Sequence, residues 1–125
     1  MEVWIANADG SNAKQVSSFG QANWAPAYMP DNKRIIFASN HEYKRGFPFN
    51  LYIMNGDGTG MVKISRDKGF DAFPMFSPDG KKLAAAGHDF KAGAEIGLVH
   101  QFSFEDGKEI KTPAEAGVSG AMAAR

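Results

Sequence analysis

The fold is decided by the segment Phe73-Pro74-Met75-Phe76-Ser77-Pro78-Asp79-Gly80-Lys81-Lys82-Leu83-Ala84-Ala85-Ala86. It reads as an apolar strand, a tight turn and a second apolar strand. Pro78 presets φ at a turn corner, and Asp79-Gly80 supplies the positive φ that a short hairpin connection needs. The segment therefore predicts a β-hairpin whose turn is specified by its own residues.

The same pattern occurs 48 residues earlier as Ala25-Pro26-Ala27-Tyr28-Met29-Pro30-Asp31-Asn32-Lys33-Arg34-Ile35-Ile36-Phe37-Ala38. Asn32 stands where the later copy has Gly80, and Asn is the other residue that tolerates the left-handed conformation. Aligning residues 3–40 with 51–88 without a gap gives ten identities in 38 positions. A repeat of this length indicates a solenoid, a propeller or an array. Short β-type runs separated by Asp-Gly turns, without a helical stretch, favour propeller blades.

The expected fold class is all-β, with about two to two and a half β-propeller blades, each a four-stranded antiparallel meander. The hairpin supplies the two inner strands of a blade, and the Asn-x-Asp-Gly turns join the two outer ones. We therefore expect a half blade at 1–18 and complete blades at 24–65 and 72–112. Residues 113–125 are rich in Ala and Gly, and we expect a flexible tail there.

Composition narrows the classes of partner. The 14 Lys and Arg residues balance the 14 Asp and Glu residues, so net charge does not indicate a nucleic-acid or anionic-membrane partner. The apolar runs are only as long as strands, so we expect no membrane insertion, and the first residues do not resemble a secretory signal. The chain has no cysteine, which excludes disulfides, thiolate metal sites and a cysteine nucleophile but leaves the compartment open.

The repeat resembles the TolB-like, WD40-like (PD40) propeller family. The motifs that carry this resemblance are Trp4-Ile5-Ala6-Asn7-Ala8-Asp9-Gly10-Ser11, Tyr52-Ile53-Met54-Asn55-Gly56-Asp57-Gly58-Thr59 and Pro74-Met75-Phe76-Ser77-Pro78-Asp79-Gly80-Lys81. The resemblance implies a six- or seven-bladed propeller, often periplasmic or secreted, that binds proteins or peptides or lies beside a peptidase domain. It is specific for fold and much less so for function.

An antiparallel meander places the tight turns at one end of each blade and the long, varied connections at the other. Function in such a scaffold usually lies on the long loops, and aromatic residues and Arg are the usual anchors of a binding surface. The candidate binding residues on this loop face are Trp24, His41, Tyr43, Arg45, Phe47, Arg66, Asp71, His88 and Asp89, with Phe19, Asn23 and Lys44 beside them. The alternative is that the aromatic residues only cover blade edges and that the charged residues are solvated.

No catalytic or metal-binding set emerges from the sequence. The Asn-x-Asp-Gly turns have some features of a calcium loop but lack its twelve-residue length and closing Glu. His41-Glu42 lacks the second His of a zinc helix. Asp31 and Asp79 read as turn residues that bind backbone amides, and the serines occupy turns or strand ends. We therefore expect no catalytic residue, no metal and no cofactor.

The first functional hypothesis is a non-catalytic binding module whose loop face holds a protein or peptide. The alternative is an accessory propeller domain of a peptidase or polysaccharide-processing enzyme with its catalytic domain outside this chain. A third possibility is a structural piece without a function of its own. Two or three blades cannot form a ring, so we also expect either homo-oligomers that close one, for example three chains, or a longer propeller.

Overall fold

The structure is a computed structural model, and it describes residues 1–44, 46, 48–65, 69–89, 96–105, 108–110 and 117–123. For residues 88–89, 96–100, 108–110 and 117–123 it describes the backbone alone. All regular elements in these ranges are β-strands, which confirms the predicted all-β class. Among the described residues there is no helix long and apolar enough to cross a membrane.

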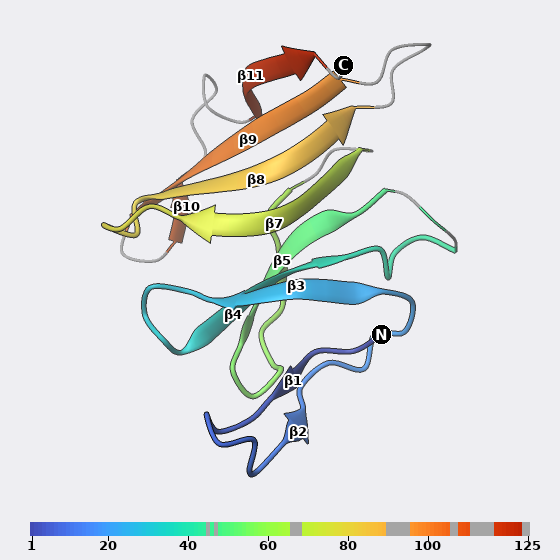
Figure 1. Cartoon of the computed structure of the whole chain (residues 1–125), viewed down its shortest axis with the longest axis vertical. Coiled ribbons are helices and arrows are strands. Elements are labelled where there is room, and N and C mark those ends of the chain that lie inside the picture. The colour runs from blue at the N-terminus through green and yellow to red at the C-terminus, as the bar shows by residue number, and fades with distance from the viewer. Residues whose placement is uncertain are drawn as a thin grey trace.

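The strands form three sheets that follow one another along the chain (Figure 1). The first is a two-stranded sheet of β1 (Trp4–Ile5) and β2 (Lys14–Gln15). The second has four strands, in the order β3 (Asn23–Tyr28), β4 (Arg34–Ser39), β5 (Asn50–Asn55) and β6 (Val62–Lys63). The third contains β7 (Phe70–Phe76), β8 (Lys82–Asp89), β9 (Ile96–Glu105) and β10 (Lys108–Ile110), with β11 (Gly117–Ala123) beside β9.

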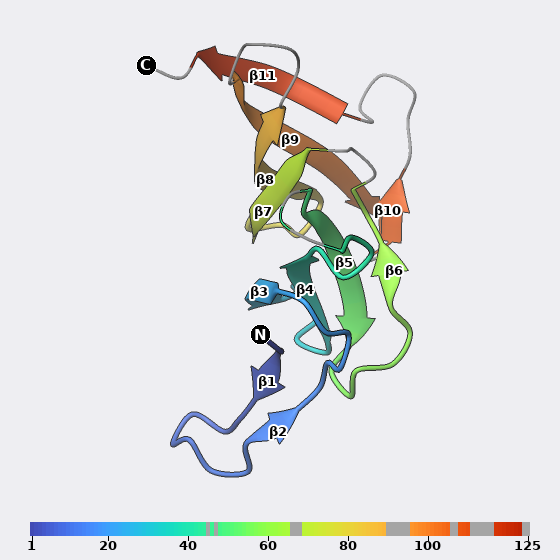
Figure 2. The same ribbon diagram turned by 90° about the vertical axis from the view of Figure 1, so that its right-hand side faces the viewer.

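In the second and third sheets, strands β3 to β6 and β7 to β10 each form an antiparallel meander in which neighbours in sequence are neighbours in space. Figure 2 shows the first strands of the two sheets, β3 and β7, on one side, and the last strands, β6 and β10, on the other. This is the arrangement of propeller blades. The sheet β1–β2 corresponds to the two outer strands of such a blade.

The chain differs from the predicted flexible tail at residues 117–123. These residues form β11, which pairs antiparallel with the Ile96–Gln101 part of β9. Strand β10 pairs with the Ser103–Glu105 part of the same strand. Strands β10 and β11 thus lie one after the other along the same edge of β9. Without them, the backbone groups of this edge would be unpaired and could bind any extended segment. The Ala- and Gly-rich composition did not reveal this pairing.

A β-bulge recurs in β3 and β7, the first strands of the second and third sheets. The register shifts between Trp24 and Ala27 in β3 and between Ala72 and Met75 in β7. The residues at the shifts, Ala25 and Phe73, have φ of 49° and 53° and precede Pro26 and Pro74, respectively. Proline cannot donate to a ladder and a bulge bends the strand, so both devices hinder the addition of another strand at this edge.

Two apolar clusters lie between successive sheets. The side chains of β4 alternate between them: Ile35 and Phe37 pack toward β1–β2, whereas Ile36 and Ala38 pack toward β7–β8. All four side chains are at most 3% exposed. Burying a large apolar side chain contributes about 1.5–3 kcal/mol, so β4 is a principal stabilising element of both interfaces. The sequence of this strand, Ile35-Ile36-Phe37-Ala38, is a continuous apolar run, as is typical of a strand that is buried on both faces.

Candidate functional site

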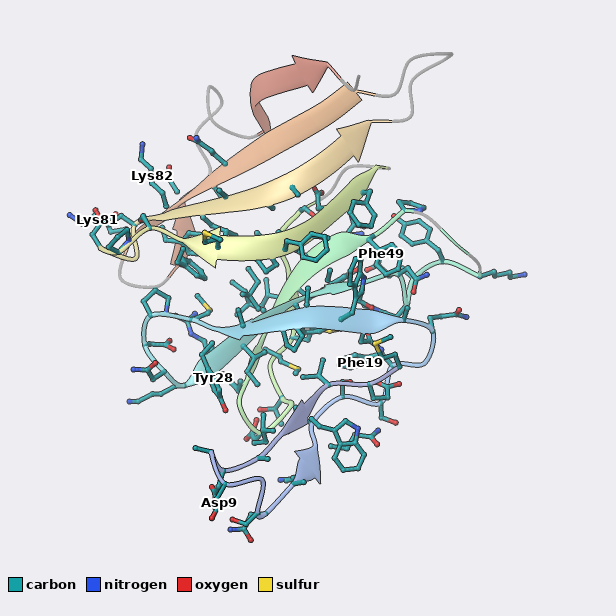
Figure 3. All side chains as sticks on the ribbon, in the orientation of Figure 1. Asp9, Phe19, Tyr28, Phe49, Lys81 and Lys82 are labelled. Atoms are coloured by element: carbon teal, nitrogen blue, oxygen red, sulfur yellow. The ribbon has the colours of Figure 1, made fainter. Side chains whose placement is uncertain are left out.

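The long connections gather at one end of the sheets. They are the β4–β5 loop at residues 40–49, the β2–β3 connection at 16–22 and the β6–β7 connection at 64–69. In Figure 3, Phe19 and Phe49 lie toward this end, whereas Tyr28, Lys81 and Lys82 lie toward the end of the tight turns. We call the first end the loop face. The loops contain polar and aromatic residues. Hydrogen bonds from the side chains of Asn40 and Glu2 hold two of the loops in place.

Asn40 ties the β4–β5 loop to the connection that precedes β3. Its Oδ1 accepts a hydrogen bond from the amide of Ala22 at 2.9 Å, and its Nδ2 donates to the carbonyl of Gly46 at 2.8 Å. Its backbone amide donates to the Ala22 carbonyl, and its carbonyl accepts from the amide of Tyr43. Asn40 is only 5% exposed. One buried amide side chain thus fixes two neighbouring loops before any partner arrives.

Glu2 anchors the β2–β3 connection. Its carboxylate accepts hydrogen bonds from the Ser17 hydroxyl, from the amides of Gly20 at 2.9 Å and Phe19 at 3.4 Å, and from Asn23 Nδ2 at 3.1 Å. Burial acts to raise the pKa of Glu2, but these hydrogen bonds outweigh it and lower the pKa below its usual value. The ionised carboxylate therefore stabilises the connection near neutral pH.

His41 lies half-buried at the start of the β4–β5 loop. Its Nδ1 is 2.9 Å from the Ser39 hydroxyl, and its ring centroid is 5.4 Å from that of Phe19 and 4.7 Å from that of Tyr52. Burial lowers the pKa of His41. The negative charge of Glu42 acts to raise this pKa, and the positive charge of Lys63 acts to lower it. His41 is therefore a neutral imidazole near pH 7, able to donate or accept a hydrogen bond.

Tyr43, Glu42 and Lys63 form a charged and aromatic cluster beside His41. Lys63 Nζ lies 2.6 Å from Glu42 Oε2 and 5.9 Å from the ring centroids of both Tyr43 and Tyr52. The hydrogen bond from Lys63 lowers the pKa of Glu42. The Tyr43 hydroxyl donates to Asn50 Oδ1 at 3.2 Å. An acid, an ammonium group and a phenol ring thus stand together on the loop face, a set suited to polar recognition of a peptide.

Trp24 packs between the second and third sheets and does not project from the loops. Its ring centroid lies 5.6 Å from Phe49, 5.8 Å from Phe70 and 5.0 Å from Phe73. Its Nε1 is buried and has no hydrogen-bond partner within the described part of the chain. The alternative reading, that aromatic residues cover the blade interfaces, holds for Trp24. Phe73 itself is 57% exposed beside it.

Asp71 also departs from the expected placement. It lies on β7 opposite Gly87 and is 0% exposed, so its side chain is not presented to a partner. Its repeat equivalent, Asn23, is 1% exposed and binds Met1 and Gly20 carbonyls through Nδ2. Both positions follow long connections in the sequence, but in the fold they begin inner strands and are enclosed by the preceding sheet.

The remaining candidates are only partly described. His88 and Asp89 form the end of β8, and the backbone of His88 lies opposite Phe70. The side chains of both residues lie outside the described part of the structure. Arg45, Phe47 and Arg66 also lie outside them. The loop-face cluster therefore contains two of the nine candidates, His41 and Tyr43.

Sequence reasoning missed four residues that shape this face: Glu2, Asn40, Glu42 and Lys63. Glu42 and Lys63 are 21 positions apart, and pairing requires the β4–β5 loop to lie beside β6. Asn40 could have been suspected because Asn after a strand often binds neighbouring backbone groups. Among the described residues, no group of three His, Asp or Glu side chains could hold a metal ion.

Comparison with known proteins identifies a family. The family model described as PD40, the TolB beta propeller domain, matches residues 1–112. A solved structure of a TolB from Agrobacterium tumefaciens superposes with a TM-score of 0.73 at 19% identity, covering 98% of this chain and 42% of that chain. At this identity the structural likeness speaks for the fold alone.

Two curated relatives match shorter stretches. The Tol-Pal system protein TolB of Alcanivorax borkumensis is 30% identical over 83 residues, which are 66% of this chain and 18% of that protein. Dipeptidyl-peptidase 5 of Porphyromonas gingivalis is 46% identical over 39 residues, 31% of this chain and 6% of that protein. The chain thus spans less than a fifth of the length of either relative.

Proposed function

Because the chain belongs to the family of TolB β-propeller domains, we propose that it is a non-catalytic binding module whose loop face holds a protein or peptide partner. The observation that carries the proposal is the anchored β4–β5 loop with the Glu42–Lys63 pair and Tyr43. A pre-ordered surface loses little conformational entropy when a partner binds, so its polar contacts convert more fully into affinity. A relative that functions in the Tol-Pal system agrees with a protein partner.

The charges of this cluster define how a partner would be held. Glu42 and Lys63 present both signs within one ion pair whose side chains are 42% and 28% exposed, respectively. Tyr43 adds a flat, half-buried ring over which Lys63 lies. A peptide backbone or a polar side chain can bind to such a set without displacing the Asn40 anchor. Pairs of this kind favour specificity over raw affinity.

A soluble form of the Pal component of the Alcanivorax borkumensis Tol-Pal system is the first probe, with binding measured by calorimetry. We expect Glu42→Lys and Tyr43→Ala to weaken binding about tenfold or more, a loss of about 1.4 kcal/mol or more. Lys81 and Lys82 lie at the opposite end of the sheets (Figure 3). Lys81→Ala and Lys82→Ala therefore serve as controls that should change the binding affinity little. Equal losses at both ends would contradict a loop-face site.

A second candidate function is that of an accessory domain of a peptidase, in which the propeller admits or excludes substrate. The observation that favours it is the 46% identity to dipeptidyl-peptidase 5 over 39 residues. The test is a reconstitution with a peptidase domain encoded beside this segment, measured as a change in its preference for long over short peptides. If the chain leaves that preference unchanged, this candidate is excluded.

Ring closure and location complete the proposal. The described strands make one two-stranded, one four-stranded and one five-stranded sheet, so a closed ring needs blades from further copies or from the rest of a longer propeller. Light scattering coupled to size exclusion distinguishes a closed oligomer from a monomer. Family membership also supports a periplasmic or secreted location, which fractionation of the producing cell would test.

A further inference from the structure

A buried chain of hydrogen bonds begins at the side-chain amide of Asn23 and ends at the imidazole of His41. Three oxygen atoms surround Nδ2 of the amide: the carbonyls of Met1 at 3.0 Å and Gly20 at 2.9 Å, and Oε2 of Glu2 at 3.1 Å. Carbonyl and carboxylate oxygens only accept hydrogen bonds, so the atom that faces them is the NH₂ end of the amide. The other end, Oδ1, is therefore an acceptor.

The direction of the next hydrogen bond is thereby fixed. The buried hydroxyl of Ser39 lies 2.6 Å from Asn23 Oδ1, and its single proton must be donated to that oxygen. Ser39 Oγ also accepts a hydrogen bond from the backbone amide of His41 at 3.1 Å. Because no proton of the hydroxyl is left for His41 Nδ1, 2.9 Å away, Nδ1 must carry a proton and donate it. His41 is thus held in its Nδ1–H tautomer.

The other ring nitrogen of His41 is left with a lone pair. A neutral imidazole carries one proton, and burial, which lowers the pKa of His41, favours the neutral ring near pH 7. Nε2 makes no hydrogen bond within the described part of the chain and is not one of the buried, unpartnered polar atoms there, so it is accessible to solvent. The half-buried ring, between Phe19 and Tyr52, therefore has one acceptor available to a partner.

The repeat does not require this chain of hydrogen bonds. Asn23 pairs with Ser39 across the second sheet, as Asp71 pairs with Gly87 across the third. The residues 48 positions after Asn23, Ser39 and His41 are Asp, Gly and Asp. The third sheet thus has the same strand pairing without the amide, the hydroxyl or the imidazole. Because the sheet forms without them, their presence at the loop face needs a reason other than folding.

The groups packed around His41 give the site both charges but no net charge. Glu42 follows His41 in the β4–β5 loop, Lys63 approaches from β6 and Tyr52 from β5, while the β2–β3 connection contributes the uncharged ring of Phe19. Lys63 and Glu42 neutralise each other across 2.6 Å. Burial raises the pKa of Tyr52, and the hydrogen bond from Lys63 lowers that of Glu42, so both keep their charge state between about pH 5 and 8. His41 alone of this set changes charge in that range.

We propose that Nε2 of His41 is a hydrogen-bond acceptor of the loop face and binds a neutral N–H donor of the partner, a backbone or side-chain amide. This inference rests on the proposed function and names the group that the partner supplies. A partner that offers a carbonyl or a carboxylate at this point faces a lone pair and is rejected at neutral pH. Protonation of His41 turns Nε2 into a donor, so the partner is released in acid.

The tautomer is tested on the chain without a partner. At about pH 7.5, a long-range ¹H–¹⁵N correlation spectrum should show Nδ1 of His41 as a protonated ring nitrogen and Nε2 as an unprotonated one. The spectrum of His41→Gln assigns these signals among the three histidines. Ser39→Ala removes the acceptor of the Nδ1 proton and should let the ring populate both tautomers. An Nε2–H ring in the unchanged chain, or an unaltered tautomer in folded Ser39→Ala, would overturn the proposal.

The donor of the partner is tested by the pH dependence of binding, with the soluble Pal component as the probe. Below the pKa of His41, which is lower than its usual value of about 6.5, affinity should fall up to about tenfold per pH unit. Gln places an acceptor oxygen near the position of Nε2 but does not titrate. His41→Gln should therefore bind within about threefold of the unchanged chain at neutral pH and lose the acid dependence, whereas His41→Leu should bind about tenfold more weakly.

The possible outcomes separate this proposal from the function on which it rests. Stronger binding in acid would reveal an acceptor on the partner and overturn the choice of group, and so would an acid dependence that His41→Gln retains. If the unchanged chain binds no Pal at any pH, the proposed function fails with this probe, and the donor of the partner fails with it. The spectra decide the tautomer of His41 in either case.

Discussion

Gly10 and Gly58 occupy the same position in the two Asn-x-Asp-Gly turns but differ in their surroundings. Their φ angles are +83° and +89°, so alanine at either site adopts the left-handed region at a cost of about 1–2 kcal/mol. A Cβ at Gly58 would lie 2.1 Å from the carbonyl oxygen of Val16 on the preceding unit, whereas a Cβ at Gly10 would meet nothing within 4 Å. Overpacking typically costs a further 1–3 kcal/mol or so.

We therefore expect Gly10→Ala to lower the free energy of unfolding by about 1–2 kcal/mol and Gly58→Ala by about 2–5 kcal/mol. Urea unfolding followed by tryptophan fluorescence measures the difference. With a slope of about 1–3 kcal/mol per M, the Gly58 variant should unfold about 1 M urea below the Gly10 variant. Equal midpoints would refute the view that this turn packs against the backbone of the preceding unit, since the conformational cost alone is shared by both glycines.

Three further outcomes follow from buried or hydrogen-bonded groups. Asn23→Ala should cost about 1–3 kcal/mol in urea unfolding, because it leaves the buried Ser39 hydroxyl and two carbonyls without their Asn23 partner; an unchanged midpoint would contradict this. Burial lowers the pKa of His41, so the unfolded chain binds the proton more readily; stability should fall as pH drops below about 6.5, and His41→Gln should flatten that slope. Burial acts to raise the pKa of Asp31, but hydrogen bonds from two backbone amides and the Arg34 side chain lower it to about 2. The contribution of ionised Asp31 to the free energy of unfolding should be complete above about pH 4 and lost as the pH falls toward 2. In acid titrations of stability, Asp31→Asn should lose less stability over this pH range than the unchanged chain.

The turns show why so much of the fold could be predicted. Asn7, Asp9 and Ser11 make the same hydrogen bonds as Asn55, Asp57 and Thr59, with the Asp Oδ1 accepting from an amide two residues on at 2.9 Å in both turns. In both, the hydroxyl of Ser11 or Thr59 lowers the pKa of the Asp, as expected for a capping carboxylate. Such bonds form between residues two to four positions apart, so a single segment of sequence is sufficient to specify them.

The candidate site was predicted less well, for a physical reason that Trp24 and Asp71 illustrate. Both were assigned to the loop face because they follow long connections, yet each begins an inner strand that the neighbouring sheet encloses. Whether a residue at a strand end faces solvent depends on the packing of a unit more than 20 residues away. Conversely, the pair Glu42 and Lys63 carried no local signal, because their contact arises only when a loop and an outer strand lie side by side.

The amino-acid sequence was sufficient for the strand order, the turn positions, the 48-residue repeat and the propeller family, because each rests on local backbone preferences repeated in register. The packing of one unit on another was needed to show that β11 shares the edge of β9 and that Asn40 and Glu2 anchor the loops. Long-range contacts depend on the relative placement of whole sheets, and the free energy that fixes this placement is spread over many apolar side chains. No short motif encodes it.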